Sequence, residues 1–174
     1  EAIRQMRLDV GRDNVLYVHV TLMPYIRASE ELKTKPTQHS VGKLREIGIQ
    51  PDILICRTEK ALSDDVKEKI SLFCNVNKDS VIEARDAESI YQVPLIFKEQ
   101  GLDKIILDHF KLKSRSTDLK DWAKFVVERA IHPRHRITVA IVGKYIGLQD
   151  AYKSIYESLV HAGIYNDAKV IIKK

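Results

Sequence analysis

Apolar and polar residues alternate along the chain with two different spacings. Short β-rich apolar runs at residues 14–22, 52–57 and 80–84 have the length and composition of buried strands. Between these runs, apolar residues recur three or four positions apart, which predicts helices: Val41, Leu44 and Ile47 in the first, and Val66, Ile70 and Phe73 in the second. This order predicts an α/β fold with a parallel sheet and helices on its faces.

Local signals suggest where these elements begin and end. We expect a long loop over residues 23–38 between the first strand and its helix, and Ser63 at the start of the second helix. Residues 88–100 have a helical pattern, which we expect to be interrupted at Pro94 and closed by Gly101.

A change of composition separates the last third of the chain. Residues 111–136 begin with a basic, polar stretch that indicates a linker, and Thr117 is expected to cap a helix within it. The α/β pattern then restarts with a strand at residues 137–143. A helix closed by Gly163 and a strand at residues 168–173 are expected to follow.

The two ends suggest that the chain is a segment of a longer polypeptide. It opens inside a helical pattern marked by Ile3, Met6 and Val10, with no Ser, Thr, Asp or Asn ahead of them to cap the helix. It stops almost at the end of an apolar strand. We expect the natural polypeptide to extend beyond both ends.

Composition limits the possible classes of protein. The 174 residues are 44% hydrophobic and 30% charged, which is enough apolar surface for a core and argues against disorder. No apolar stretch approaches the roughly 18 residues of a spanning helix, and the first residues lack a signal-peptide core. We therefore expect no membrane partner, and two cysteines without a metal or redox spacing favour the cytoplasm as a reducing compartment. The net charge of +5 is a mild excess that suits nucleotides. No aromatic residues interleave with the basic runs, so we expect no nucleic acid partner.

Several common chemical motifs are missing. Cys56 and Cys74 have neither a metal nor a redox spacing, and both are expected to be free, buried thiols. His19 lies in an apolar strand and is expected to be a hydrogen-bonded core histidine. The sequence contains no glycine-rich phosphate loop and no dinucleotide fingerprint. We assign no catalytic residue and no metal ligand, so the chain by itself lacks a complete catalytic site.

The segment before the first helix carries the most specific pattern. Pro36 biases Lys35 toward an extended conformation, in which Lys33 and Lys35 project from the same side. Thr37 or Ser40 can cap the following helix, whose free N–H groups then face the same region. Two ammonium groups beside a helix N-terminus suit a triphosphate. From the pattern alone, a lysine-rich surface loop with a helix cap is the more common explanation.

Two further positions are candidates with strong structural alternatives. Lys69 lies on a predicted helix, where a solvated pair with Asp65 is the ordinary expectation. Arg85 and Asp86 follow the third strand at its carboxyl end, where open α/β sheets bind ligands. A turn closed by Asp86 explains the same residues without a ligand.

Longer stretches of the chain resemble the CTP synthase family, whose members are glutamine-dependent ligases that aminate UTP in pyrimidine biosynthesis. These stretches are residues 19–25, 31–41, 47–57, 72–76, 89–91, 101–103, 142–145 and 150–154. They run in the family's order almost from end to end of the chain, which is far more specific than any single motif.

The resemblance implies a domain organisation. Residues 1–110 are expected to be the C-terminal part of a synthetase (amidoligase) domain with a P-loop-like parallel sheet. Residues 111–136 correspond to the interdomain linker. Residues 137–174 are expected to form the first β-α-β unit of a class I glutamine amidotransferase, or glutaminase, domain.

The resemblance also implies binding residues. The family's UTP-binding segment, which CTP shares as feedback inhibitor, corresponds to Lys33, Thr34, Lys35, Pro36, Thr37, Gln38 and Lys69. The family's ATP-contacting segment corresponds to Arg85, Asp86 and Ala87. Many members have Lys and Val in place of Arg85 and Ala87. Arg85 preserves the positive charge of the lysine. Ala87 has a smaller side chain than valine and would make a smaller apolar contact.

The chemistry implied by the resemblance uses several small molecules. ATP phosphorylates the 4-oxygen of UTP, and ammonia released from glutamine displaces that phosphate to give CTP. Mg²⁺ is the implied metal, GTP the implied activator and a homotetramer the implied assembly. The family's phosphate loop, Mg²⁺ ligands and glutaminase Cys, His and Glu have no counterpart here, so we expect the chain alone to be inactive. A non-catalytic nucleotide-binding or regulatory truncated paralogue is the alternative.

Overall fold

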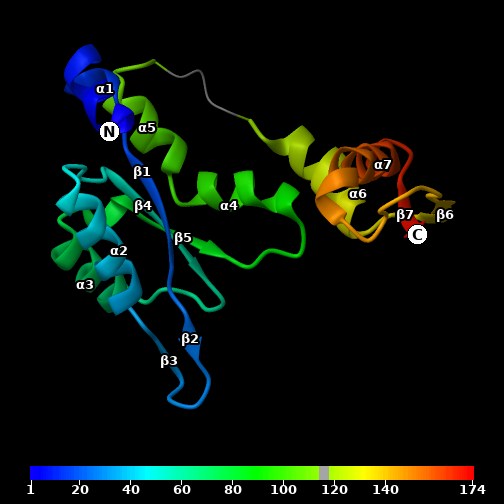
Figure 1. The fold of residues 1–174 in the computed structure, drawn as a ribbon, viewed down its shortest axis with the longest axis horizontal. Helices are drawn as coiled ribbons and strands as arrows, with labels where there is room; N and C mark the ends of the chain where they lie inside the picture. Colours follow the sequence, from blue (N-terminus) through cyan, green and yellow to red (C-terminus); the bar gives the residue numbers. More distant parts are fainter. Residues whose placement is uncertain (114–117) are drawn as a thin grey trace. The chain divides into compact units, whose positions relative to one another are not determined.

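The computed structural model describes residues 1–113 and 118–174, which fall into two compact units (Figure 1). The first unit holds the described residues of 1–86 and 96–115, and the second those of 87–95 and 116–174. Each unit has its own parallel sheet with helices beside it. The expected mixed α/β class is therefore confirmed, whereas the assignment of residues 1–110, 111–136 and 137–174 to named domains stays a prediction.

The first unit is built on three parallel strands. They are β1 (Val18–Leu22), β4 (Ile53–Thr58) and β5 (Val81–Arg85), in the order β1-β4-β5. All three runs were expected as strands, although residues 14–17 of the first run lie outside β1. The structure places β4 in the centre, where both of its faces are covered.

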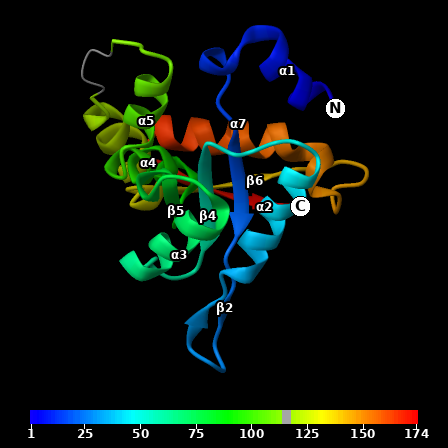
Figure 2. The same cartoon turned by 90° about the vertical axis from the view of Figure 1, so that its left-hand side faces the viewer.

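Two helices cover one face of this sheet. They are α2 (Lys35–Glu46) and α3 (Asp64–Cys74), and Figure 2 shows α2 alongside β1. The core on this side consists of Met23, Val41, Leu54, Cys56, Leu62, Ile70, Cys74 and Val81. Both cysteines are free and buried, as expected. Phe73 was expected on the buried face of α3 but is exposed, because Cys74, four residues after Ile70, occupies that position instead.

A second core lies on the other face of the sheet. Ile53 and Ile82 pack there against Leu102 at the start of α5 (Leu102–His109). The expected interruption at Pro94 is wrong. A 3₁₀ turn, η3 (Ile90–Gln92), leads into α4 (Val93–Glu99), and Pro94 stands in the first turn of α4, where its missing N–H costs nothing. Gly101 has a left-handed φ of 75° and separates α4 from α5, as its predicted closing role requires.

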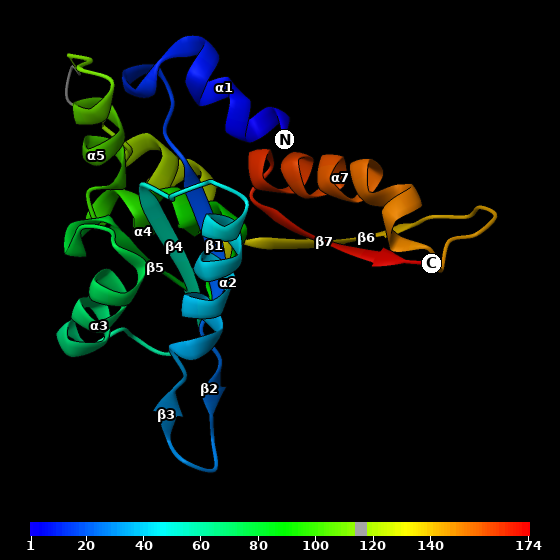
Figure 3. The same ribbon diagram turned by 60° about the vertical axis from the view of Figure 1, so that its left-hand side comes forward.

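Part of the expected loop at residues 23–38 is regular structure. It contains an antiparallel hairpin of β2 (Tyr25–Ile26) and β3 (Glu31–Leu32), and α2 already begins at Lys35. The hairpin projects from the end of the sheet below α2 (Figure 3). Such short strands carry too little pattern to be recognised in the sequence.

Short helical elements precede β1 and β5 in the first unit. Ahead of β1 come α1 (Ala2–Val10) and the 3₁₀ turn η1 (Arg12–Asn14), and η2 (Lys78–Ser80) leads into β5.

One face of β1 carries a row of apolar side chains that are exposed to solvent: Val18, Val20 and Leu22, at 42%, 58% and 62%. Among the described strands, β1 has a neighbour on one side only, which is β4.

The second unit has a two-stranded sheet. Its strands are β6 (His135–Ala140) and β7 (Ala168–Lys173), which pair in parallel through the intervening α7 (Lys153–Tyr165). The 3₁₀ turn η5 (Gln149–Tyr152) leads into α7. This is the β-α-β order expected from the sequence.

The end of α7 differs from the expectation. Gly163 does not close the helix, which continues to Tyr165. A Cβ atom on Gly163 would lie 2.5 Å from the backbone oxygen of Ala168, so the absent side chain lets α7 approach β7 closely. Gly163 is therefore a packing position rather than a helix terminator.

Before β6, the second unit contains the π-helical segment η4 (Trp122–Val127) and α6 (Glu128–Ile131). The indole Nε1 of Trp122 donates a hydrogen bond to the backbone oxygen of Tyr91 at 2.8 Å. The helix expected inside the linker is thus present, whereas its expected cap, Thr117, lies outside the described residues. No helix in the described parts of the chain has both the length and the apolarity to cross a membrane.

Candidate functional site

The carboxyl ends of β1, β4 and β5 bring the sequence-predicted binding residues to one edge of the first unit's sheet. Beyond the strands, the N–H of Met23 donates to the oxygen of Arg57 at 2.8 Å, and the N–H of Asp86 donates to the oxygen of Thr58 at 3.2 Å. These bonds hold the three segments that leave the strands beside one another. In open α/β sheets, ligands bind at this edge.

The β2–β3 hairpin fixes the position of Lys33. The N–H of Lys33 donates to the oxygen of Pro24 at 3.0 Å, which closes the base of the hairpin. The ammonium of Lys33 forms an ion pair with the carboxylate of Glu31, and both side chains are about half exposed. Lys33 is therefore held by its backbone, whereas its charged end stays in contact with solvent.

The start of α2 corrects the predicted geometry of the lysine segment. Lys35 is the first residue of α2 rather than part of an extended segment, and Thr34 occupies the N-cap position instead of Thr37 or Ser40. The helix starts early because Pro36 fits the first turn, where its fixed φ is already helical. Lys33 and Lys35 consequently lie on either side of the cap residue.

Thr34, Thr37 and Gln38 form the support of this turn. Thr37 is fully buried, and its hydroxyl is 3.0 Å from the hydroxyl of Thr21 and 3.3 Å from the oxygen of Leu22. The side-chain amide of Gln38 donates to the hydroxyl of Thr34 at 3.1 Å. These bonds fasten the first turn of α2 to the end of β1, so the exposed residues of the segment are Lys33, Lys35 and Pro36.

His19 supports the same helix from the sheet. Its Nε2 lies 2.8 Å from the hydroxyl of Ser40, which confirms the expected hydrogen-bonded role. Burial lowers the pKa of His19 from its usual value of 6.5, because the charged imidazolium is poorly solvated there. The neutral ring is therefore favoured in the folded chain.

The charges around the two helix starts differ in sign. The first turn of α3 contains Asp64 and Asp65, which complement the positive end of the helix dipole. The first turn of α2 contains no acidic residue, and Lys33 and Lys35 add positive charge beside its dipole. This N-terminus is therefore an electropositive position suited to an anion.

The charge of Lys69 has a minor influence near the lysine segment. The pKa of Glu31 is lowered first by its hydrogen bond and charge contact with Lys33, with a smaller contribution from the charge of Lys69. Lys69 itself lies on α3. The expected partner of Lys69, Asp65, makes no ion pair with it within the described residues.

Arg85 and Asp86 lie at the end of β5 and are each paired with an opposite charge. The Nε of Arg85 is 2.5 Å from a carboxylate oxygen of Glu83, and a carboxylate oxygen of Asp86 is 3.1 Å from an Nη of Arg57. Asp86 therefore pairs with the end of β4, and neither its turn-closing role nor its predicted role in ATP contact is tested. Ala87 falls among the residues of the second unit, and its predicted role in ATP contact stays untested.

The carboxylates at this edge do not form a metal site. Glu31, Glu83 and Asp86 each pair with a cationic side chain. Across residues 1–113 and 118–174, no group of three or more His, Cys, Asp or Glu side chains is arranged to hold a metal ion. These residues therefore do not fit the Mg²⁺ implied by the family resemblance.

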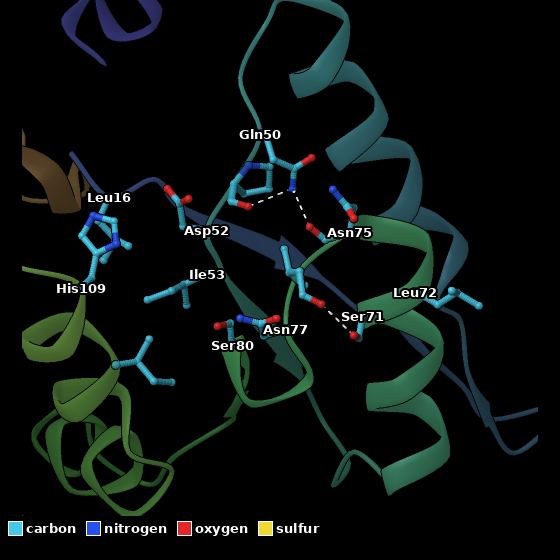
Figure 4. A pocket seen from close by; sticks show the side chains of 13 residues that line it. Leu16, Gln50, Asp52, Ile53, Ser71, Leu72, Asn75, Asn77, Ser80 and His109 are labelled. Atoms are coloured by element: carbon cyan, nitrogen blue, oxygen red, sulfur yellow. Dashed lines mark hydrogen bonds between the residues drawn. The ribbon is translucent and has the colours of Figure 1, made fainter. Parts of the chain in front are cut away.

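A cavity of about 500 Å³ lies at the opposite, amino-terminal edge of the same sheet (Figure 4). Sequence reasoning did not anticipate it, because its lining residues belong to no recognisable motif. Its polar groups are largely engaged: Gln50 Nε2 donates to the backbone oxygens of Pro51, Cys74 and Asn75, and Ser71 donates to Val76. None of the predicted binding residues lines this cavity.

Comparison with known proteins identifies relatives over nearly the whole chain. The sequence profile of the family described as CTP synthase N-terminus matches residues 1–112. The chain is 60% identical over 172 residues to the CTP synthase of Methanocaldococcus jannaschii, and 55% identical over 172 residues to that of Methanococcus maripaludis. It is 54% identical over 173 residues to that of Moorella thermoacetica. Each alignment covers 99% of this chain and 32% of the relative, so the chain spans about a third of the length of these curated relatives.

Proposed function

Because the chain belongs to the CTP synthase family, we propose that it supplies the UTP- and CTP-binding segment of an enzyme that aminates UTP to CTP. ATP would activate the 4-oxygen of UTP by phosphorylation, and ammonia from glutamine would displace the phosphate. Residues 137–174 would then begin the domain that releases the ammonia, and residues 111–136 would link it to the synthetase domain.

The electropositive N-terminus of α2 is the observation that best supports this proposal. Lys33 and Lys35 flank its cap residue, Thr34, and the first turn of α2 itself contains no acidic side chain. A triphosphate would replace the weak pairing of Lys33 with Glu31 by several charge-assisted hydrogen bonds. Lys69, on the neighbouring α3, would contact the same anion.

The end of β5 gives the proposed place of ATP contact. Arg85 and Asp86 lie at the same carboxyl edge as the lysine segment. A phosphoryl group moves from ATP to UTP, so both nucleotides must be held at neighbouring positions. A guanidinium at this edge would bind the ATP phosphates and stabilise negative charge that shifts between oxygens.

A chimeric enzyme tests the UTP assignment. The chain would replace the segment of the CTP synthase of Methanocaldococcus jannaschii with which it aligns over 172 residues. Lys33→Ala together with Lys35→Ala should raise the KM for UTP about tenfold or more and weaken inhibition by CTP, because two cationic contacts are lost. The thermal midpoint should not change, since both side chains are exposed.

The matched control is Lys43→Ala in the last turn of the same helix. Lys43 is exposed and pairs with Glu46, far along α2 from the cap residue. This variant should leave both nucleotide constants unchanged. An unaltered KM for UTP in the double variant would show that the lysine segment does not bind the triphosphate.

A further inference from the structure

Glu83 is a buried carboxylate near the carboxyl end of β5. Its side chain is only 11% exposed. One carboxylate oxygen accepts a hydrogen bond from the N–H of Leu62 at 2.6 Å, and the other lies 2.5 Å from Nε of Arg85. The backbone of Glu83 is also fixed, because the side-chain amide of Gln100 bonds to both its N–H and its oxygen at 2.7 Å. Glu83 is therefore held on both its backbone and its side chain.

Burial of this carboxylate is not a favourable way to stabilise a strand. A charged group loses much of its hydration when it is buried, and a buried ion pair often contributes less than an apolar residue of similar volume. Neighbouring positions on the same face are filled by apolar residues such as Val81 and Leu62. Stability alone therefore does not account for a glutamate here, whereas its contacts with Arg85 and Leu62 suggest a role in positioning.

The geometry of the ion pair leaves part of Arg85 available. The contact with Glu83 is made at Nε, which leaves the terminal nitrogens to make further bonds. The Arg85 side chain is 55% exposed. Where a glutamate occupies position 83, an arginine can bind it and a phosphate at once, whereas the single ammonium of a lysine would have to divide its donors between the two.

The neighbouring ion pair provides a contrast. Arg57 and Asp86 are 3.1 Å apart, and both side chains are more than 60% exposed. Water competes strongly with such a pair, and it fixes neither side chain firmly. Glu83 differs because it is buried and because it also binds the backbone of Leu62, in the segment that leads from β4 to α3.

We propose that Glu83 is a positioning residue for nucleotide binding, which holds Arg85 through Nε and presents its terminal nitrogens to the phosphates of ATP. The same carboxylate fixes the β4–α3 segment at Leu62. This inference rests on the proposed contact between Arg85 and ATP. It assigns a role to a residue that makes no contact with the nucleotide itself.

Substitutions of Arg85 in the chimeric enzyme test the proposal without altering the buried residue. Arg85→Lys keeps the positive charge, but Glu83 should capture the single ammonium. The KM for ATP should therefore rise about as much as in Arg85→Gln, roughly fivefold to tenfold. If Arg85→Lys retains the original KM while Arg85→Gln does not, the positioning role is excluded.

The double variant provides the second readout. Adding Glu83→Gln to Arg85→Lys should release the lysine and lower the KM for ATP below that of Arg85→Lys alone. Glu83→Gln by itself should raise the KM for ATP about fivefold and leave the KM for UTP unchanged, because the amide oxygen still accepts from Leu62 but no longer holds the guanidinium. If Glu83→Gln raises the KM for ATP and the KM for UTP equally and also lowers the thermal midpoint, the role of Glu83 is purely structural and the proposal is overturned.

The outcomes separate this inference from the proposed function. An unchanged KM for ATP in Arg85→Gln would contradict the ATP contact itself. The role of Glu83 alone would be contradicted if Arg85→Gln raises the KM for ATP but the double variant has the same KM for ATP as Arg85→Lys. Glu46→Gln is the matched control, because Glu46 also pairs with a cation but is exposed at the end of α2, and it should change neither constant.

Discussion

Thr34 and Thr37 show how neighbouring residues decide the role of identical side chains. Thr34 precedes α2 and Thr37 lies in its first turn. Threonine is a common helix cap, so either residue is a candidate for that position. Pro36 decides between them, because it stands in the first turn and places Thr34 at the cap and Thr37 in the core. The candidate binding segment was assigned from its resemblance to the family and stays a prediction, whereas this local geometry required the structure.

His19 makes a prediction for the pH dependence of stability. Its pKa is lowered in the folded chain, so the unfolded chain binds more protons near and below pH 6.5. The stabilising contribution is complete above the unfolded pKa and is lost as the pH falls toward the folded pKa. In His19→Gln, which can keep a hydrogen bond to Ser40 but does not titrate, this loss should be absent.

Urea unfolding of the chain and of His19→Gln at about pH 7.5 and about pH 5.5 measures this difference. The free energy of unfolding should decrease more on acidification in the original chain than in the variant. The same decrease in both proteins would show that His19 does not contribute to the pH dependence.

At the scale of the element, the packing of α7 on β7 depends on Gly163. Gly163→Ala would place a Cβ atom 2.5 Å from the oxygen of Ala168 and 2.9 Å from a methyl group of Val170. The neighbouring atom on Ala168 is backbone and cannot turn away, so the helix or the strand must shift. We expect a loss of about 1–3 kcal/mol in the free energy of unfolding, measured by chemical denaturation.

Gly42 is the matched control in α2. No atom lies within 4 Å of a Cβ built at this position. Gly42→Ala should therefore stabilise the chain by about 0.5–1 kcal/mol, because alanine restricts the unfolded chain and favours the helix. Destabilisation by both variants to the same degree would contradict the close approach of α7 and β7.

The elements that could be predicted are those with a long or strongly apolar pattern. β4, β5 and β7 follow β-rich runs, and α3 begins at the expected Ser63 cap. The β2–β3 hairpin was missed because two-residue strands have no measurable period. Pro94 and Gly163 were interpreted as helix breakers, although a proline in a first turn and a glycine at a close contact are both compatible with a helix.

At the scale of the whole molecule, the candidate site depends on contacts that the sequence does not encode locally. Lys33, Lys69 and Arg85 are on three different segments, and the parallel register of β1, β4 and β5 sets where these segments leave the sheet. The family resemblance grouped the three residues, but nothing in their spacing did so. Glu83 was missed altogether, because within a strand it has no sequence signal that distinguishes it from a solvated glutamate.

The apolar row on β1 has a consequence for handling the chain in solution. An edge strand with free backbone groups and exposed Val18, Val20 and Leu22 is a template for strand addition between molecules. The purified chain should therefore self-associate as its concentration rises, with growth of particle size in dynamic light scattering. Val20→Lys should suppress this growth, because a buried lysine in an intermolecular sheet is unfavourable, and Lys43→Ala should not. Colloidal stability, and not only folding stability, would then limit experiments on the isolated chain.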